Sequence, residues 1–308
     1  MENTRAKTTR NSLILLLTAT IWGMAFVSQS KGMDYMHPFT FNGVRSLIGA
    51  AGILVYILIS RKIAGDKAAK LDWKLNVRAG LLCGIFLTIA STLQQFGIKY
   101  TSVGKAGFIT TLYIIFVPMF GIFLKKKVAP VVWAAAGMSA VGMYLLCMTE
   151  SLRLGAGDIM VFLCAIAFAI QIMTVDHYAA RIDGAVVSCI QFTVCGVVCC
   201  IGALIWGQPT FGQIQEGLGA LLYAGVLSCG VGYTLQIVGQ KGLNPTVAAL
   251  IMSLESVIAT ISGWIAYKIG FLSTDQTLTP RQIAGCVIVF AAVILVQLPP
   301  EWFRFGKK

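Results

Sequence analysis

The stretch TLQQFGIK at residues 92–99 decides the fold, because it returns as TLQIVGQK at residues 234–241. The two copies lie 142 residues apart. At the same spacing, and without a gap, identical pairs follow: Ala106 and Ala248, Ile109 and Ile251, Leu112 and Leu254, Gly121 and Gly263. Chance similarity between two apolar segments is the alternative. A shared string inside two matching hairpins instead favours an internal repeat.

The composition predicts that this repeat lies in lipid. The chain of 308 residues is 57% hydrophobic and 12% charged, whereas a soluble domain usually carries about 25% charged residues. A soluble fold of this length has too little interior to bury such an apolar excess, so a bilayer is the expected surroundings.

Ten apolar runs are long enough to cross a bilayer, which takes about 20 residues for roughly 30 Å of hydrocarbon. They cover residues 12–30, 38–60, 77–98, 103–124, 129–148, 155–175, 184–206, 216–238, 244–267 and 280–298. The first run is too long for a signal peptide and lacks a small-residue cleavage site, so we interpret it as a span. The one sizeable cytoplasmic loop is expected from Arg61 to Asn76.

Five spans make one repeat, which gives two units at residues 12–148 and 155–298. Because five is odd, the second unit enters the membrane from the opposite side. Inverted repeats of this kind are typical of alternating-access carriers, whose substrate site lies near the midplane where the two copies meet. The expected fold is therefore an all-α membrane protein of about ten transmembrane helices in two inverted five-helix repeats, and the expected function is transport.

The basic residues predict the orientation. The net charge of +12 comes from 24 Lys and Arg against 12 Asp and Glu. These residues lie between the apolar runs rather than on one face, which argues against nucleic acid as a partner. With the N-terminus inside, 17 of them fall in cytoplasmic segments and 6 in outer ones. By the positive-inside rule we expect a multi-pass protein of the plasma or inner membrane with both termini cytoplasmic.

Glu255 is the one Glu that lies in the middle of a span. A charged acid at a helix centre costs roughly 2.5–3.5 kcal/mol on insertion scales, so it needs a reason. The functional readings are binding of a substrate ammonium group, or uptake and release of a coupling proton. The structural reading is a carboxyl that is protonated or hydrogen-bonded to another helix. Its repeat counterpart, Tyr113, is also polar and lies mid-span.

Arg45 is the second charged residue inside a span. Its guanidinium stays charged at any accessible pH, so it must meet an acid, several carbonyl groups or water. It could contact a substrate carboxylate or a gate, or it could hold two helices together through an ion pair.

Two amides and an aromatic residue complete the candidate site. Gln94 and Gln236 occupy equivalent positions in the two repeats, which suggests a cavity lined from both halves; interhelical hydrogen bonding is the alternative. Trp22 begins a stripe with Phe26 and Gln29, which could stack on an organic solute or simply pack against neighbours. The predicted substrate-binding residues are Glu255, Gln94, Gln236, Tyr113, Trp22 and Arg45.

The nine cysteines and two histidines show no zinc-like spacing, so neither a metal nor a cofactor is expected and the cysteines are interpreted as small packing residues. Gly80 and Gly84 form a GxxxG motif, and small residues also crowd 134–140. Such residues fit either tight packing within the bundle or the face of a homodimer.

The whole chain resembles an EamA-type member of the drug/metabolite transporter superfamily, as two EamA repeats. The residues that carry the resemblance are Trp22-Gly23 with Phe26, Pro38, Arg45, Gly157-Asp158, Asn244-Pro245, Leu254-Glu255-Ser256 and Gly263-Trp264. This chain has Glu255-Ser256 where the family often has Glu-Pro, and a run of lysines at 125–127 where an acidic residue is usual. The resemblance implies a central cavity and export of metabolites such as amino acids, or of drug-like compounds.

Other classes of function fit less well. An enzyme acting on a lipid or lipid-linked group would need paired acids, a histidine-based site or a metal cluster, and Asp158, Asp176 and His177 are too sparse. A channel would need rings of repeated polar residues along a pore. The predicted function is secondary active transport of a small molecule by alternating access, with proton coupling resting on Glu255 alone, and not catalysis.

Overall fold

The computed structural model describes residues 2–65, 71–125, 128–147, 155–273 and 275–297, and within these ranges it contains helices and turns but no strand. The first repeat comprises α1 (Glu2–Gly32), α2 (Pro38–Ala64), α3 (Trp73–Ile98), α4 (Val103–Thr111), α5 (Tyr113–Phe123) and α6 (Pro130–Cys147). The second comprises α7 (Ala156–Tyr178), α8 (Gly184–Gly202), η2 (Ala203–Gly207), α9 (Phe211–Glu216), α10 (Leu218–Leu222), η3 (Tyr223–Gly232), α11 (Tyr233–Gln240), α12 (Pro245–Met252), α13 (Leu254–Lys268) and α14 (Pro280–Gln297).

The helical segments match the predicted spans in number. In the described part of the chain, 8 helical runs are long and apolar enough to cross a membrane, and two shorter apolar helices lie at Pro130–Gly142 and Pro280–Leu295. The all-α membrane fold is thus confirmed. The predicted loop from Arg61 to Asn76 is too long, because α2 continues to Ala64 and α3 already begins at Trp73. A helix can extend beyond its apolar run where a side chain caps its end. Asp72 caps the start of α3, because its side chain accepts a hydrogen bond from the Leu75 N–H at 3.0 Å.

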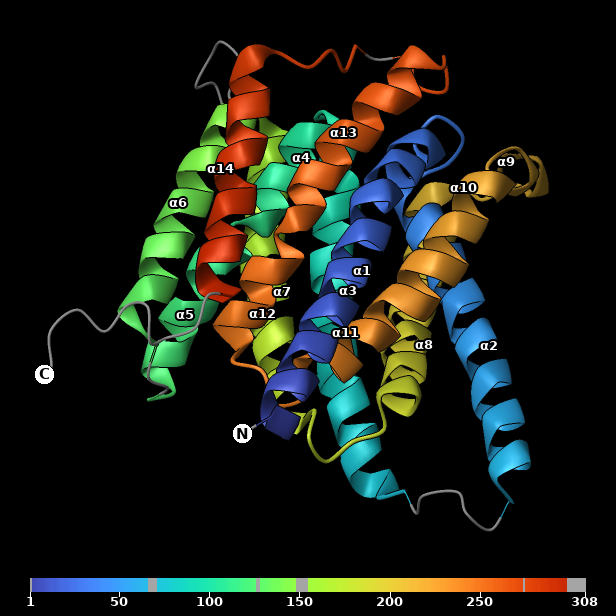
Figure 1. The fold of residues 1–308 in the computed structure, drawn as a ribbon. Helices are drawn as coiled ribbons and strands as arrows, with labels where there is room; N and C mark the ends of the chain where they lie inside the picture. The colour runs from blue at the N-terminus through green and yellow to red at the C-terminus, as the bar shows by residue number, and fades with distance from the viewer. Residues whose placement is uncertain (1, 66–70, 126–127, 148–154, 274, 298–308) are drawn as a thin grey trace, which may run out of the picture.

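The packing of the helices has the symmetry expected of inverted repeats. Helix α2 packs on its counterpart α8, and α6 packs on its counterpart α14. The contact of α3 with α7 also has a counterpart. The span formed by η3 and α11 corresponds to α3, and α1 corresponds to α7; these two also pack on each other. Figure 1 shows α6 and α14 side by side at one edge of the bundle and α2 at the other. Such paired contacts are what a twofold axis between the halves produces.

Two predicted spans are broken in the middle. The run 103–124 divides into α4 and α5 at Leu112, and the run 244–267 divides into α12 and α13 at Ser253. At each break a tighter turn replaces the α-helical pattern: Leu112 N–H donates to Ile109 O at 3.2 Å, and Ser256 N–H donates to Ser253 O at 3.1 Å. The breaks lie at nearly equivalent places in the two repeats. Discontinuous spans are a feature of transporter binding sites.

The GxxxG motif serves packing inside one chain. A Cβ atom on Gly80 would lie 2.6 Å from Ile190 Cβ, and one on Gly84 would lie 2.9 Å from Val194 Cβ. Both neighbours belong to α8, so the two glycines allow α3 and α8 to approach closely across the repeats. Of the two interpretations of this motif, the structure supports tight packing within the bundle.

Helix α2 packs against the bundle along only part of its length. Its buried residues run from Pro38 to Ile53, and none of its last three turns is buried. In Figure 1 the lower end of α2 leans away from the other helices.

Candidate functional site

A small cavity lies between the two repeats near the breaks of the broken helices. It is lined by Trp22, Phe26, Gln29, Arg45, Gln94, Thr110, Tyr113, Phe168, Gln171, Ile172, Ser228, Tyr233, Gln236 and Glu255. All six residues predicted from the sequence are among them, although they come from α1, α2, α3, α5, α11 and α13. The fold therefore brings the candidates together; that they bind a solute stays a prediction.

Tyr113 and Glu255 meet in this cavity. The Tyr113 hydroxyl donates to Glu255 Oε1 at 3.0 Å, and both side chains are buried. These residues are each other's repeat counterparts, 142 positions apart. A residue can touch its own counterpart only next to the axis that relates the halves, so this hydrogen bond marks the centre of the molecule. The structural reading of Glu255, a hydrogen bond to a neighbouring helix, is observed, and it coexists with a position at the cavity wall.

Arg45 lies in the cavity wall and forms no ion pair with any carboxylate of the described residues. Its Nε donates to Asn42 Oδ1 at 2.9 Å, and its guanidinium lies 5.4 Å from the centre of the Phe41 ring. Asn42 is itself fixed, because its Nδ2 donates to Ser91 O at 2.9 Å. A charged group that is 5% exposed and held on one side only leaves its other donors for a ligand or water. An ion pair that joins helices, one alternative for Arg45, is not observed in the described residues.

The repeat-related amides both reach the cavity but bond differently. Gln94 Nε2 donates to Thr110 Oγ1 at 3.1 Å, whereas Gln236 Nε2 donates to Gln171 Oε1 at 3.2 Å. Four buried polar atoms of the lining have no hydrogen-bond partner within the described chain: Trp22 Nε1, Gln29 Oε1, Gln171 Nε2 and Gln236 Oε1. Leaving such a group unpaired costs roughly 1–3 kcal/mol. These two donors and two acceptors belong to residues that line the cavity, where water or a polar solute would have to supply the missing hydrogen bonds.

Glycines let α1 approach closely enough to line the cavity. A Cβ atom on Gly23 would lie 2.7 Å from Glu255 O, and one on Gly232 would lie 2.7 Å from Trp22 Nε1. The Trp22 ring also lies 4.5 Å from the Tyr233 ring between centroids. The Trp22-Gly23 pair therefore has two roles, since the indole faces the cavity while the glycine admits the backbone of α13.

Thr110, Ile172 and Ser228 also line the cavity, and the sequence had not pointed to them. Thr110 could have been found, because it lies one helical turn before Tyr113. Ser228 could not, because it belongs to the π-helical η3, whose side chains depart from the regular 3.6-residue period.

Polar residues close to Gln94 and Gln236 in the sequence contact neighbouring helices instead. Gln95 Nε2 donates to Gln29 O at 3.1 Å, and Gln240 Nε2 donates to Ile172 O at 3.4 Å. Ser91 bonds the Cys195 sulfur at 3.4 Å. Helical spacing identifies a face but not which part of it meets a cavity.

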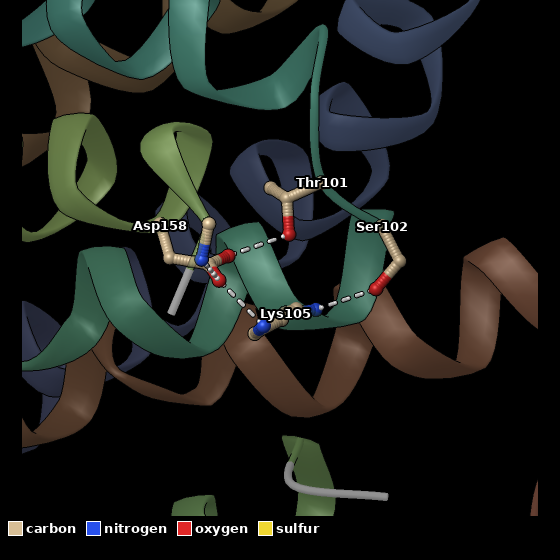
Figure 2. A network of polar contacts seen from close by, with 5 residues as sticks. Thr101, Ser102, Lys105 and Asp158 are labelled. Atoms are coloured by element: carbon tan, nitrogen blue, oxygen red, sulfur yellow. Dashed lines mark hydrogen bonds and ion pairs between the residues drawn. The ribbon is translucent and has the colours of Figure 1, made fainter. Parts of the chain in front are cut away.

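The end of the molecule opposite the start of α1 is closed by an ion pair between the repeats. Lys105 Nζ of α4 lies 2.6 Å from Asp158 Oδ2 of α7, and the Asp158 side chain is 4% exposed. Figure 2 shows Asp158 also accepting from Thr101 Oγ1, at 2.9 Å. The Gly155 N–H donates to Asp158 Oδ2 at 2.9 Å, so this carboxylate also caps α7. Both partners were visible in the sequence, but only the fold shows that these helix ends meet.

The acidic residues of α7, Asp158 and Asp176, lie too far apart to share one enzymatic site. Asp158 and Asp176 lie near opposite ends of α7, which at 1.5 Å per residue places them about 27 Å apart. Within the described residues no group of three His, Cys, Asp or Glu side chains could hold a metal ion. No observation therefore favours the lipid-modifying enzyme.

The volume of the central cavity is about 30 Å³. A cavity needs roughly 10–15 Å³ on this measure to hold one water molecule, and small-molecule sites usually measure about 300–1,000 Å³. The cavity in this conformation therefore has room for about two water molecules. A solute the size of a metabolite would enter only after the two repeats move apart on one side.

Known proteins resemble this chain over more than nine-tenths of its length. A sequence model of the EamA-like transporter family matches residues 10–148 and again residues 155–298. An uncharacterized transporter of Archaeoglobus fulgidus is 27% identical over 92% of this chain and 84% of its own length. The uncharacterized transporter YwfM of Bacillus subtilis is 24% identical over 94% of each chain. A solved crystal structure superimposes with a TM-score of 0.74 at 16% identity, over 96% of this chain and 99% of the other, which shows a shared fold.

Proposed function

This chain belongs to the EamA-like transporter family, and from that premise we propose that it is a secondary active exporter of a small metabolite such as an amino acid, or of drug-like compounds. It is a multi-pass membrane transporter. The finer proposal is that the two repeats rock about the central cavity, so that a solute bound there faces one side of the membrane and then the other.

One observation carries the proposal: the cavity on the axis between the repeats is lined by charged, amide and aromatic side chains in an otherwise apolar interior. A site on the axis is reached equally from both sides when the repeats exchange conformations. Buried polar groups without partners in such a place are costly unless a ligand or water satisfies them. In a carrier these polar groups would bind the solute, whereas a purely structural bundle would be more stable without them.

The two charges in the wall support an amino acid as the solute. Arg45 and Glu255 line the same cavity without forming an ion pair with each other. An amino acid carries an α-carboxylate that matches the guanidinium and an α-ammonium that matches the carboxylate. The aromatic rings of Trp22 and Phe168 would then contact its side chain.

Proton coupling by Glu255 is part of the proposal. A carboxyl group in the wall of a cavity that opens to each side in turn can take up a proton on one side and release it on the other. Its partner Tyr113 would hold the side chain in place through the exchange. The positive-inside bias of 17 basic residues to 6 supports cytoplasmic termini, and with that orientation export would run from the end where α1 begins towards the end that carries Lys105 and Asp158.

The proposal is tested by transport in liposomes. The purified protein is reconstituted, the vesicles are loaded with a panel of labelled amino acids, and efflux is measured with and without an imposed pH gradient. We expect at least one amino acid to leave these liposomes faster than it leaves loaded liposomes without the protein. The pH gradient should accelerate its efflux.

Glu255→Gln and a matched control separate the two parts of the proposal. Glu255→Gln keeps the shape of the side chain and should abolish the effect of the gradient, whereas Glu216→Gln, on the exposed surface of α9, should retain it. A Glu255→Gln variant with unchanged pH dependence would remove the proton role. Absence of efflux for every amino acid would remove this class of substrate.

A further inference from the structure

A second and larger cavity lies at the end of the molecule where α1 begins. Its volume is about 530 Å³, and it shares no lining residue with the central cavity. Its walls come from the last turns of α2, the start of α3, the connection between α7 and α8, and the end of α11. None of the residues proposed to bind the transported solute lines this space.

The cavity is bounded by three basic residues, Arg61, Arg181 and Lys241. They come from three different parts of the chain, and the fold brings them to one place. Lys241 Nζ donates to Ile182 O at 3.2 Å, and an ammonium has three N–H groups, so one contact leaves donors for a ligand.

The two acidic residues in the wall are already occupied by helix ends. Asp72 Oδ1 accepts from the Leu75 N–H at 3.0 Å, which caps α3. Asp183 Oδ1 accepts from the Ala185 N–H at 2.9 Å and from the Val186 N–H at 3.1 Å, which caps α8. Each carboxylate thus offsets the positive end of a helix dipole. The basic side chains therefore dominate the charge of the cavity.

Part of the remaining wall is apolar. Tyr56 and Ile57 of α2 and Val238 of α11 form this part, the wedge, beside the polar side chains of Ser60, Asn76 and Thr234. Tyr56 is 61% exposed, and no residue of α2 beyond Ile53 is buried. In Figure 1 the lower end of α2 leans away from the other helices, so its exposed apolar side chains would face the surrounding lipid.

We propose that this cavity binds a phospholipid with an anionic headgroup. The phosphate would lie against Arg181 and Lys241, and an acyl chain would fill the wedge between α2 and α11. A soluble anion would match the charge but would leave the apolar side chains of Tyr56, Ile57 and Val238 uncovered. Basic pockets between transmembrane helices are a known class of site for anionic headgroups. Only the leaflet, the inner one, depends on the orientation proposed above; the binding itself does not depend on the transport function.

The test measures lipid binding to the full-length protein in neutral detergent. Phosphatidylglycerol, phosphatidylcholine and soluble glycerol 3-phosphate are titrated separately, with retained lipid counted by native mass spectrometry and thermal stability followed in parallel. We expect phosphatidylglycerol to bind and to raise the melting temperature, and the other two compounds to do neither. Equal effects of both lipids, or binding of glycerol 3-phosphate as tight as that of the lipid, would overturn the proposal.

Variants localise the site. Arg181→Gln and Lys241→Gln should each weaken phosphatidylglycerol binding about fivefold, because one basic residue near an anionic headgroup contributes about 1 kcal/mol. Lys62→Gln is the matched control, since Lys62 lies exposed on α2 beside Arg61 but does not line the cavity. Ile57→Trp would fill the wedge without changing the charge and should displace the lipid in the same way. If all of these variants bind like the control, the lipid does not occupy this cavity.

Discussion

At the scale of single residues, the hydrogen bond from Tyr113 holds the carboxyl group of Glu255 in place at the centre of the molecule. It joins α5 and α13 directly after the break in each span. A hydrogen bond to a charged group contributes about 1.5–3 kcal/mol, so the tyrosine has a large influence on the position and charge of the carboxyl.

We expect Tyr113→Phe to fold normally but to transport about tenfold more slowly, because a factor of ten corresponds to about 1.4 kcal/mol, the lower end of the range for a hydrogen bond to a charged group. The measurement is efflux from liposomes at several pH values, compared with Tyr223→Phe. Tyr223 donates to Ile21 O at 3.2 Å outside the cavity, so its loss should leave the pH profile unchanged. Identical profiles for both variants would place Tyr113 outside the transport mechanism.

His37 gives the protein a predicted pH dependence at the N-terminal end of α2. Burial, followed by the nearby Lys99 ammonium, lowers the pKa of His37 from its usual 6.5. Its Nδ1 accepts from the Phe39 N–H at 3.4 Å, which only the neutral ring can do. Below about pH 6.5 the unfolded chain therefore binds a proton that the folded protein resists, and stability falls as the pH drops.

The check is the melting temperature in detergent between about pH 7.5 and pH 5, where the unfolded imidazole titrates. We expect the wild type to lose stability over this range, and His37→Asn, which can still cap the helix, to lose less. His177→Asn is the control for the second histidine. An equal loss in all three proteins would assign the pH dependence to other groups.

At the scale of elements, the ends of α4 and α7 are held together by the Lys105–Asp158 ion pair, while the ends of α2 and α11 stand apart. Removing one partner of a buried, hydrogen-bonded pair leaves the other charge uncompensated. The contact between these ends of α4 and α7 therefore depends on both residues.

Asp158→Asn should lower the free energy of unfolding by about 1–3 kcal/mol. Adding Lys105→Gln to it should restore part of that loss, because the orphaned charge is removed as well. The comparison is Asp34→Asn, which breaks the ion pair of Lys31 with Asp34, whose side chain is 51% exposed. Exposed pairs contribute about 0–1 kcal/mol, so this variant should change little. Equal losses in the two single variants would contradict the special role of the buried pair.

The elements also show what the sequence could and could not predict. Hydropathy identified the spans, because a run of about 20 apolar residues is stable in the hydrocarbon layer of a bilayer and rarely occurs elsewhere. The repeat at residues 92–99 and 234–241 predicted the symmetry, and with it the meeting of Gln94 and Gln236 at one cavity. The breaks at Leu112 and Ser253 were not predicted, because each lies between two equally apolar half-helices. The Lys105–Asp158 pair and the separation of α2 depend on which helix ends meet, and no local pattern encodes that.

At the scale of the whole molecule, a cavity of about 30 Å³ implies motion. The repeats must separate for a metabolite to enter, first on one side and then on the other. Residues of the wall that are now 0–9% exposed should therefore become accessible during transport.

This motion can be followed with a single introduced thiol. In a background whose nine native cysteines are replaced, Ser228→Cys should react with a membrane-impermeant thiol reagent added to either side, and a transported solute should slow the reaction. Ser188→Cys is the control, because Ser188 is buried away from the cavity and should stay unreactive. Reaction from one side only, under every condition, would contradict alternating access.

The contact of Tyr113 with Glu255 also constrains how such a protein can have arisen. A gene for one five-helix unit would yield two identical subunits in antiparallel association, and every position on their axis would face its own copy. Two glutamates there would repel one another, and two tyrosines would lack a carboxylate acceptor. A donor opposite an acid therefore requires the two halves to carry different residues at this position, which a single chain of two repeats allows and a pair of identical subunits does not.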